Sequence, residues 1–250
     1  MSVCAVVPAA GRGTRLGLDR PKILAPLTAS ETIWSVLRAK LLAVADRVHV
    51  VVAPDGLAAM RAATRDDPDA GRLSLSVQER PTGMGDAIFG CHDAWRDATT
   101  LLVVWGDQVF VSDATLRAAV GRHGGAARRL VLPVVSLPEP YVEYVFAPGG
   151  GLDGVRQTRE GDRCAPGGLG DVGTFALSPC GLAGAWRDYR AGAARGARTG
   201  EVNFLPFLPF LAAAGWAVEP LMVADAREAR GVNTPDDLAY FRNLQGGRGQ

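Results

Sequence analysis

The sequence predicts an α/β fold in which a mostly parallel central sheet is followed by a mixed-sheet second half. Short apolar runs rich in β-branched residues occur at Val3–Val7, Val48–Ala53, Leu73–Val77 and Leu101–Trp105, and each is typical of a buried strand. Segments with helical periodicity separate these runs. Strand and helix alternating in this way indicate right-handed βαβ units, with helices on both faces of a parallel sheet.

Two helices of the first half can be placed from their patterns. The first follows Thr28 and Glu31, which have the spacing of a capping box. Its apolar positions recur at helical spacing, at Ile33, Trp34, Leu37, Leu41 and Val44. The second helix has Ile88, Cys91 and Trp95 on one face.

The second half of the chain is less regular. Apolar runs at 130–135 and 142–147 precede a glycine-rich turn at 149–151, which favours a mixed sheet with insertions. The chain has 250 residues and 48% hydrophobic content, enough to bury a sizeable core. We expect residues 1–250 to form a single domain.

Charge and composition exclude several classes of partner. The 27 Lys and Arg against 26 Asp and Glu give a net charge of +1, so no global field attracts nucleic acid or an anionic membrane. No apolar run approaches membrane-spanning length, and the apolar start of the chain has no preceding basic residue. The four cysteines lack metal-like or paired spacing. We expect a cytoplasmic protein that binds neither nucleic acid nor membrane.

The stretch PAAGRGTRLGLDRPK, from Pro8 to Lys22, directly follows the first predicted strand. It is not a Rossmann fingerprint, because its glycine spacing differs and Pro21 blocks an immediate helix, and it lacks the Gly-Lys-Ser/Thr of a P-loop. What remains is a longer loop whose backbone N–H groups can surround a polyphosphate, with positive charge from Arg12, Arg15 and Lys22. The alternative is a surface turn with incidental basic residues.

Three further positions carry side chains suited to a nucleotide and a metal. Gln78 ends a strand-like run, and its amide can donate to and accept from the edge of a pyrimidine. Asp107 and Asn233 offer a carboxylate and an amide oxygen, which magnesium prefers. The alternatives are a polar strand end at Gln78, a turn residue or helix cap at Asp107, and a cap of the helix from Pro235 at Asn233.

Four motifs in order resemble the nucleotidyltransferases that join a nucleoside triphosphate to a sugar 1-phosphate, and among them the bacterial N-acetylglucosamine-1-phosphate uridylyltransferases. GRGTRLGLDRPK resembles the signature G-x-G-T-R-[LM]…P-K, and the segment from Gln78 to Ala87 resembles Q…G-T-G-x-A. Trp105-Gly-Asp107 resembles Y-G-D, and Gly231-Val-Asn233 resembles G-V-N. The resemblance implies a Rossmann-like, three-layer nucleotidyltransferase fold of the GT-A-like type.

The resemblance also implies an activity and its residues. The activity is Mg²⁺-dependent transfer of a nucleoside monophosphate from the triphosphate, with a pyrimidine base, to a sugar 1-phosphate or similar phosphorylated polyol, releasing pyrophosphate. The implied catalytic pair is Arg15 and Lys22, and the implied metal ligands are Asp107 and Asn233. The implied nucleotide-binding residues are Ala10, Gly11, Gly13, Thr14, Gln78, Gly83 and Gly85, where the last two let the backbone approach a flat ring.

The sugar-binding segments depart from the family pattern. Where the uridylyltransferases have E-x-N-T-G and N-A-x-G-E-Y-Y, this chain keeps only Gly173 and Glu201 in place, and Asp171 stands where Asn is expected. Tyr144 lies where the family has a glycine-rich turn. We expect these four residues to contact the acceptor, and we expect an acceptor other than N-acetylglucosamine 1-phosphate.

The sequence contains no hexapeptide repeats, so we expect no β-helix acyltransferase domain. Two alternative functions stay open at this point. One is a cytidylyltransferase acting on a phosphorylated alcohol or a phosphonate. The other is a catalytically silent, nucleotide-binding regulatory module, which the presence of Arg15, Lys22 and Asp107 disfavours.

Overall fold

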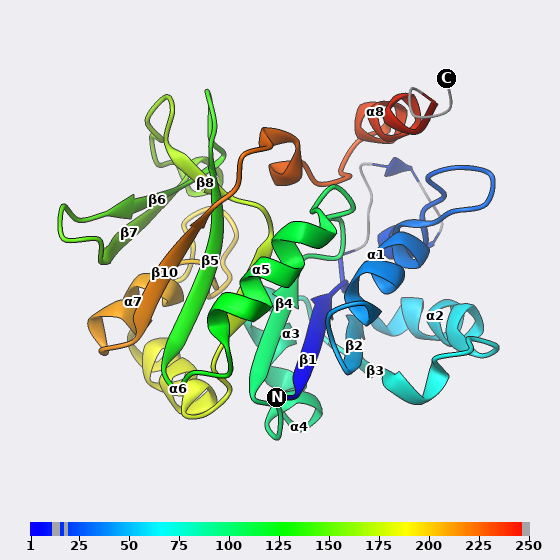
Figure 1. Cartoon of the computed structure of the whole chain (residues 1–250), viewed down its shortest axis with the longest axis horizontal. Coiled ribbons are helices and arrows are strands. Elements are labelled where there is room, and N and C mark those ends of the chain that lie inside the picture. The colour runs from blue at the N-terminus through cyan, green and yellow to red at the C-terminus, as the bar shows by residue number, and fades with distance from the viewer. Residues whose placement is uncertain (12–15, 18–19, 247–250) are drawn as a thin grey trace.

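The computed structural model describes residues 1–11, 16, 17 and 20–246 of the chain. The strands of this part are β1 Val3–Pro8, β2 Arg47–Val52, β3 Leu73–Val77, β4 Thr100–Val104, β5 Arg129–Ser136, β6 Val142–Phe146, β7 Leu152–Gln157, β8 Leu169–Asp171, β9 Thr174–Leu177 and β10 Ala217–Met222. They join into one sheet in the order β3-β2-β1-β4-β9-β5-β8-β6-β7, with β10 paired to β5 (Figure 1).

The helices are α1 Ile33–Leu42, α2 Leu57–Thr64, α3 Met84–Gly90, α4 His92–Trp95, α5 Asp113–His123, α6 Leu182–Gly192, α7 Phe207–Ala213 and α8 Pro235–Gly246. Figure 1 shows α1 and α5 on the near face of the sheet and α3 on the far face. None of the helices that the structure describes is both long enough and apolar enough to cross a membrane.

The first half of the sheet is parallel, as the sequence predicts. β1 pairs in parallel with β2 and β4, and β2 pairs in parallel with β3. The observed strands match the four predicted apolar runs to within about one residue at each end. Because the strands are parallel, their carboxyl ends meet at one edge of the sheet, and the loops that follow β1 and β4 lie there together.

The second half of the sheet is mixed, which confirms the predicted fold class. β9 runs antiparallel between β4 and β5 and so joins the two halves. β6 and β7 form an antiparallel hairpin, and β8 pairs antiparallel with both β5 and β6. β10 returns parallel to β5.

Alternating side chains of the central strands separate two apolar cores. In β1, Ala5 and Val7 face one core while Cys4 and Val6 face the other, as strand geometry requires. The first core packs against α1, α2, α5 and α8, and the second packs against α3, α4, α6 and α7. The molecule therefore has the expected three layers, with helices on both faces of the sheet.

The two predicted helices form with altered boundaries. The N-cap of α1 is Thr32, which completes a capping box with Ser35, so the capping box predicted at Thr28 and Glu31 is wrong. Those two residues bond to each other in the preceding turn instead, where Glu31 N donates to Thr28 Oγ1 over 3.1 Å. α1 ends at Leu42, before Val44.

The second predicted helix is broken into α3 and α4 at Cys91, whose φ of −101° and ψ of 29° are not helical. The predicted face nevertheless exists, because Ile88, Cys91 and Trp95 are all buried.

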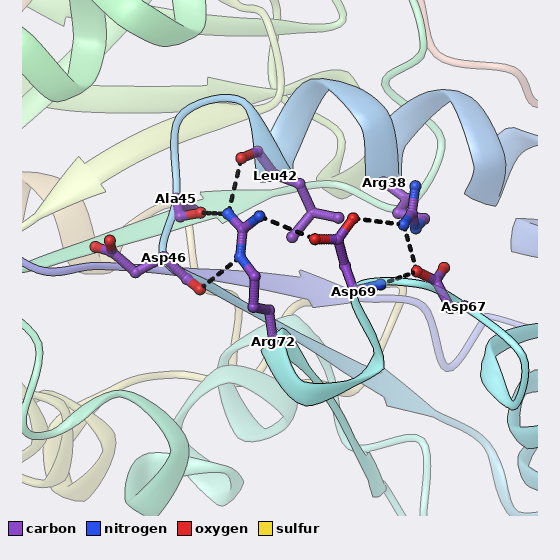
Figure 2. Close-up of polar contacts among 7 residues, drawn as sticks. All are labelled: Arg38, Leu42, Ala45, Asp46, Asp67, Asp69 and Arg72. Carbon is purple, nitrogen blue, oxygen red and sulfur yellow. Dashed lines mark hydrogen bonds and ion pairs between the residues drawn. The ribbon is translucent and has the colours of Figure 1, made fainter.

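A charged network, which we call the α1 anchor, consists of Arg38, Asp67, Asp69 and Arg72 (Figure 2). Arg38 pairs with Asp67 and, over 2.8 Å, with Asp69; Asp69 also accepts from Arg72 over 3.2 Å. Arg72 further donates to the backbone oxygen of Leu42, the last residue of α1, and to those of Ala45 and Asp46 in the connection to β2. The last carbonyls of a helix have no partner within the helix. The α1 anchor supplies such a partner and thereby joins the carboxyl end of α1 to the segment before β3.

Candidate active site

A cavity of about 380 Å³ opens at the carboxyl edge of the sheet and is lined by residues of both halves. From the first half come the end of β1, Lys22 and the turn Trp105–Gln108 after β4. From the second half come parts of β6, β7 and β8, together with Gly231 and Asn233. Its size and position match those of ligand sites in open α/β sheets.

Lys22, Asp107 and Asn233 meet in this cavity, and we call them the cation cluster. The Lys22 ammonium donates to Asp107 Oδ2 over 2.6 Å and to Asn233 Oδ1 over 2.7 Å. The Lys22 and Asp107 side chains are only 17% and 20% exposed, so water screens their charges weakly. The fold thus brings a predicted catalytic lysine together with both predicted metal ligands, across 211 residues of sequence.

Lys22 is held by the core beneath it. It begins a short 3₁₀ turn, η2 (Lys22–Leu24), directly after Pro21, whose ψ of 135° keeps the preceding backbone extended. The next residue, Ile23, is 1% exposed in the first core and fixes the backbone of the turn. Lys22 is therefore fixed at its backbone by the core and at its ammonium by Asp107 and Asn233.

Asp107 and Asn233 are brought together by close backbone approach. The Asp107 carbonyl accepts from Val232 N over 3.0 Å, which joins the turn after β4 to the segment before α8. A Cβ at Gly231 would lie 3.0 Å from Asp107 Cγ and 3.1 Å from Asn233 Nδ2, tighter than most Cβ contacts in proteins, so either side chain would have to shift by a few tenths of an ångström. Glycine at 231 thus leaves room for the close approach of the two predicted ligands.

Asp237, which was not predicted as a site residue, positions the Asn233 segment. Its Oδ2 accepts from the backbone N–H groups of Asn233 and Thr234 over 2.9 and 2.8 Å, and its Oδ1 accepts from Arg230 over 2.8 Å. Burial raises the pKa of Asp237, but the hydrogen bonds from Asn233, Arg230 and Thr234 outweigh burial and hold that pKa below its usual value. The capping-box spacing of Thr234 and Asp237 is the signal that could have identified it.

Hydrogen bonds at the start of α8 show whether Asn233 caps the helix or offers its side-chain oxygen to the cavity. The N–H of Asp237 is capped by Thr234 Oγ1 over 3.3 Å, while the side-chain oxygen of Asn233 accepts from Lys22. The interpretation of Asn233 as the cap of α8 is therefore not what the structure contains.

The cation cluster fits a magnesium ion. Its two oxygens already converge on one cation, the Lys22 ammonium, and they are the carboxylate and amide oxygens that magnesium prefers. Within the described residues, no group of three or more His, Cys, Asp or Glu side chains is placed to hold a metal. Two protein oxygens with substrate phosphates and water suit magnesium, which keeps several of its waters.

The predicted phosphate-binding loop is only partly described. Arg15, Gly13 and Thr14 lie outside the described residues. Gly11 lines the cavity, and a Cβ there would meet no atom of the described residues within 4 Å. Ala10 lies between Ala9 and Gly11, both of which line the cavity.

In the predicted base-reading segment, Gln78 and Gly83 form a closed loop. Gln78 Nε2 donates to the Gly83 carbonyl over 2.9 Å, and its backbone N–H extends the ladder to the Val52 carbonyl over 2.9 Å. Gly83 has a φ of 113°, which glycine adopts without strain.

Gly85 is required for packing. Any Cβ at this position would lie 2.2 Å from the Trp186 ring, so the flat ring that its backbone approaches is an indole of this chain. Packing of α3 on α6 thus gives glycine at this position a structural reason, and the predicted contact with a nucleotide base stays a prediction.

The four predicted sugar-binding residues are distributed unevenly. Asp171 lines the cavity; its Oδ2 accepts from the Tyr144 hydroxyl over 2.9 Å and its Oδ1 from Gly173 N over 2.7 Å. Burial raises the pKa of Asp171, and burial with the adjacent Asp171 charge raises the pKa of Tyr144 well above its usual value. Tyr144, only 2% exposed, and Gly173, whose φ is +69°, therefore act through Asp171 rather than on the cavity surface.

Glu201 is placed elsewhere. A Cβ on Gly83 would lie 3.3 Å from the Glu201 carboxylate, so this side chain is beside the predicted base-reading loop. Sequence reasoning did not identify three polar residues that line the cavity, Gln108, Gln157 and Arg159. Gln108 directly follows the Trp105-Gly-Asp107 motif, whereas Gln157 and Arg159 belong to no motif and reach the site through the pairing of β6 with β7.

Comparison with known proteins places the chain in a family. Residues 5–166 match the family model described as a MobA-like NTP transferase domain. The protein named bifunctional protein GlmU from Acidithiobacillus ferrooxidans is 32% identical over 244 residues, which cover 96% of this chain and 51% of that protein. The protein of the same name from Kineococcus radiotolerans is 30% identical over 240 residues, covering 94% of this chain and 47% of that protein. The chain thus spans about half the length of these relatives.

A solved structure has the same fold. A Bacillus anthracis protein assigned as a glucose-1-phosphate thymidylyltransferase, crystallised with sucrose, superposes with a TM-score of 0.76 at 16% identity, covering 97% of this chain and 95% of that one. The resemblance inferred from the four motifs is confirmed, and with it the nucleotidyltransferase fold. The chain belongs to the family of MobA-like NTP transferase domains.

Proposed function

We propose that this chain transfers a nucleoside monophosphate from a nucleoside triphosphate to a sugar 1-phosphate or similar phosphorylated polyol. A phosphate oxygen of the acceptor attacks the α-phosphorus, the bond from that phosphorus to the bridging oxygen breaks, and pyrophosphate leaves. The observation that carries the proposal is the cation cluster, in which Lys22, Asp107 and Asn233 converge within hydrogen-bond distance in a cavity. The names of the GlmU relatives and of the thymidylyltransferase neighbour agree with this class of reaction.

Lys22 has the chemistry for charge stabilisation in this reaction. Two anions must approach each other, so catalysis depends on positioning and on neutralising phosphate charge. The ammonium is held without substrate by Asp107 and Asn233, and bound phosphates offer it competing oxygen partners. We assign Lys22 to the phosphate oxygens on which charge accumulates, together with Arg15 and the backbone N–H groups of the loop that begins at Gly11.

Asp107 and Asn233 would hold Mg²⁺, since both already bind one cation and Asp237 fixes the segment that carries Asn233. When bound there, the ion would neutralise phosphate charge and orient the triphosphate. The residues themselves supply one negative charge and one neutral oxygen, so they attract a divalent ion without cancelling its charge.

The closed loop between Gln78 and Gly83 supports a uracil or thymine base. The Gly83 carbonyl can only accept, so the group that donates to it must be Gln78 Nε2, and Gln78 Oε1 is left as an acceptor, which we assign to the base. We assign this acceptor to the N3–H donor of uracil or thymine; the N4 amino group of cytosine is the competing donor. UTP or dTTP is therefore the expected nucleotide.

Pyrophosphate release tests the proposal. The whole chain is incubated with Mg²⁺, each nucleoside triphosphate and a panel of sugar 1-phosphates, in parallel with EDTA and with single substrates omitted. We expect release only when nucleotide, acceptor and Mg²⁺ are all present, and fastest release with UTP or dTTP. Release with CTP and an alcohol phosphate alone, or no release with any pair, would contradict the proposal.

A further inference from the structure

The β6–β7 hairpin contributes one wall of the cavity, and the start of the loop at Gly11 contributes another. In its register Val142 pairs with Gln157, so these two side chains share one face of the hairpin, and both line the cavity. Glu143 and Arg156, which pair next in the register, lie on the opposite face. The wall therefore presents Gln157 to the ligand, and Arg159 follows it in the 3₁₀ turn η5 (Thr158–Glu160).

Two arginines of this segment differ in how their charge is matched. Arg156 pairs with Glu143 over 3.0 Å on the face away from the cavity. Arg159 lines the cavity, and within the described residues its guanidinium has no hydrogen bond or ion pair. The adjacent carboxylate of Glu160 makes its hydrogen bonds to Arg198 N and Thr199 Oγ1, over 3.1 and 2.9 Å, and interacts with Arg159 through charge alone. Arg159 is thus a cation directed at the ligand space.

Gln157 gives an independent indication of a ligand. It is 8% exposed, yet among the described residues its side-chain amide has no hydrogen-bond partner, while its backbone N–H bonds to Asp162 over 2.8 Å. Its amide atoms reach the cavity surface and are not enclosed in the interior, so the cavity is where they find a hydrogen-bond partner. Because Gln157 lines the cavity, a bound acceptor would satisfy it.

The other charges of the cavity are already matched. Asp107 is neutralised by Lys22, and both oxygens of Asp171 accept hydrogen bonds from Tyr144 and Gly173. Among the lining residues that the structure describes, Arg159 is the charged one without a hydrogen bond or ion pair, and its neighbour Glu160 acts on it through charge alone.

We propose that the acceptor carries a second acidic group besides the reacting phosphate, and that Arg159 pairs with it while Gln157 hydrogen-bonds a neighbouring oxygen. The inference rests on the proposed function and names the substrate class for it: an acidic sugar phosphate. A guanidinium matches the planar carboxylate of a uronic acid or the oxygens of a second phosphate with two parallel hydrogen bonds. Asp171, with both oxygens engaged, is left to accept from a sugar hydroxyl.

The test compares acceptors that differ in that group alone. Values of kcat/KM are measured for glucose 1-phosphate, glucuronic acid 1-phosphate and glucose 1,6-bisphosphate, and for the corresponding galactose series. We expect an acidic acceptor to exceed its neutral counterpart by about tenfold or more, the range for a hydrogen bond to a charged group. Whether the uronate or the bisphosphate is preferred identifies the acid.

Arg159→Ala should remove that preference, and Arg159→Lys should retain part of it. Arg163→Ala is the matched control, because Arg163 is an exposed arginine on the same connection that lines a different surface hollow with Cys164. The ratio of acidic to neutral kcat/KM should be unchanged in this control.

Equal or better use of the neutral acceptors, or a preference that survives Arg159→Ala, would overturn the inference while leaving nucleotidyl transfer intact. If no acceptor of either series releases pyrophosphate, the proposed function fails instead. In that case we measure by calorimetry how tightly wild type and Arg159→Ala bind glucuronic acid 1-phosphate, glucose 1,6-bisphosphate and glucose 1-phosphate. The inference holds if the acidic ligands bind more tightly than glucose 1-phosphate to wild type only, and it fails if they do not.

Discussion

The cation cluster and the α1 anchor contain the same kinds of charged group but differ in what surrounds them. Lys22 and Asp107 are 17% and 20% exposed, and Arg38 and Asp67 are 20% and 8% exposed, so burial does not separate the two. In the α1 anchor, the two arginines donate to the carboxylates of Asp67 and Asp69 and to backbone carbonyls at and after the end of α1 (Figure 2). In the cation cluster, two oxygens share one ammonium at the wall of a cavity. The comparison teaches that access to a ligand space, rather than ion pairing, separates a reactive cluster from a structural one.

The largest effect is expected for Asp107→Asn, which removes the one full negative charge from the cation cluster. Turnover should fall by roughly a hundredfold or more at limiting Mg²⁺, because a charge that stabilises the reacting phosphates is lost. The thermal midpoint should stay near that of wild type. Asp93→Asn, at an exposed surface pair, is the control that should leave turnover unchanged.

Near-normal turnover of folded Asp107→Asn at limiting Mg²⁺ would show that Asp107 has no role in the reaction and that the cation cluster is structural, like the α1 anchor.

Lys22→Ala should depress kcat by about a hundredfold and change the nucleotide KM much less, since an interaction that strengthens in the transition state acts on turnover. Lys22→Arg should also be poor, because a planar fork replaces a compact ammonium. Without nucleotide, Lys22→Ala should bind Mg²⁺ about tenfold more tightly by calorimetry, because the ammonium no longer competes for Asp107 and Asn233.

A rise in KM alone in Lys22→Ala would make the lysine part of a binding cradle and would contradict its catalytic assignment.

Asp67→Ala should show the opposite behaviour. Losing the carboxylate leaves Arg38 without one of its two partners at the α1 anchor and should lower the free energy of unfolding by about 2 kcal/mol. Urea denaturation measures this change, and kcat of the folded protein should equal that of wild type. A fall in kcat with unchanged stability would mean that the α1 anchor is coupled to the reaction.

The smallest effect is expected for Asp237→Asn, which changes a positioning residue and no ligand. It removes the charge that holds the backbone of Asn233 and Thr234, and it should weaken Mg²⁺ affinity by about tenfold, as for other groups that orient a metal ligand. Asp236→Asn, at the exposed neighbouring residue, is the control. A loss of stability at unchanged Mg²⁺ affinity would give Asp237 only the role of a helix cap.

The sequence predicted the first half of the fold better than the second for a physical reason. β1, β2 and β4 are buried on both faces, so each is a continuous apolar run. β7, with the sequence LDGVRQ, and β10, with the sequence AVEPLM, carry charged, glycine or proline residues on partly exposed strands. Their pairing is set by the neighbouring strands, and no local pattern reveals it.

The candidate site was predictable to the extent that it follows local motifs. Lys22, Asp107 and Asn233 each belong to a short motif at a strand or helix end, and the fold brings them together. Gln157 and Arg159 reach the cavity only through the register of the β6–β7 hairpin, so their spacing carries no signal. Gly85 shows a different limit of sequence reasoning. It lies in a motif, but the contact that excludes a larger residue there is with Trp186, which is distant in sequence.

A double-mutant cycle on kcat tests most directly whether the cation cluster acts as one unit. Lys22→Ala, Asp107→Asn and the double variant are compared with wild type under saturating nucleotide, acceptor and Mg²⁺. If the two residues act together, the double variant should be little worse than the poorer single variant, because the first change already removes their joint contribution. Losses that multiply, to about ten-thousandfold when each single variant loses about a hundredfold, would show that the two residues act independently and would contradict this account.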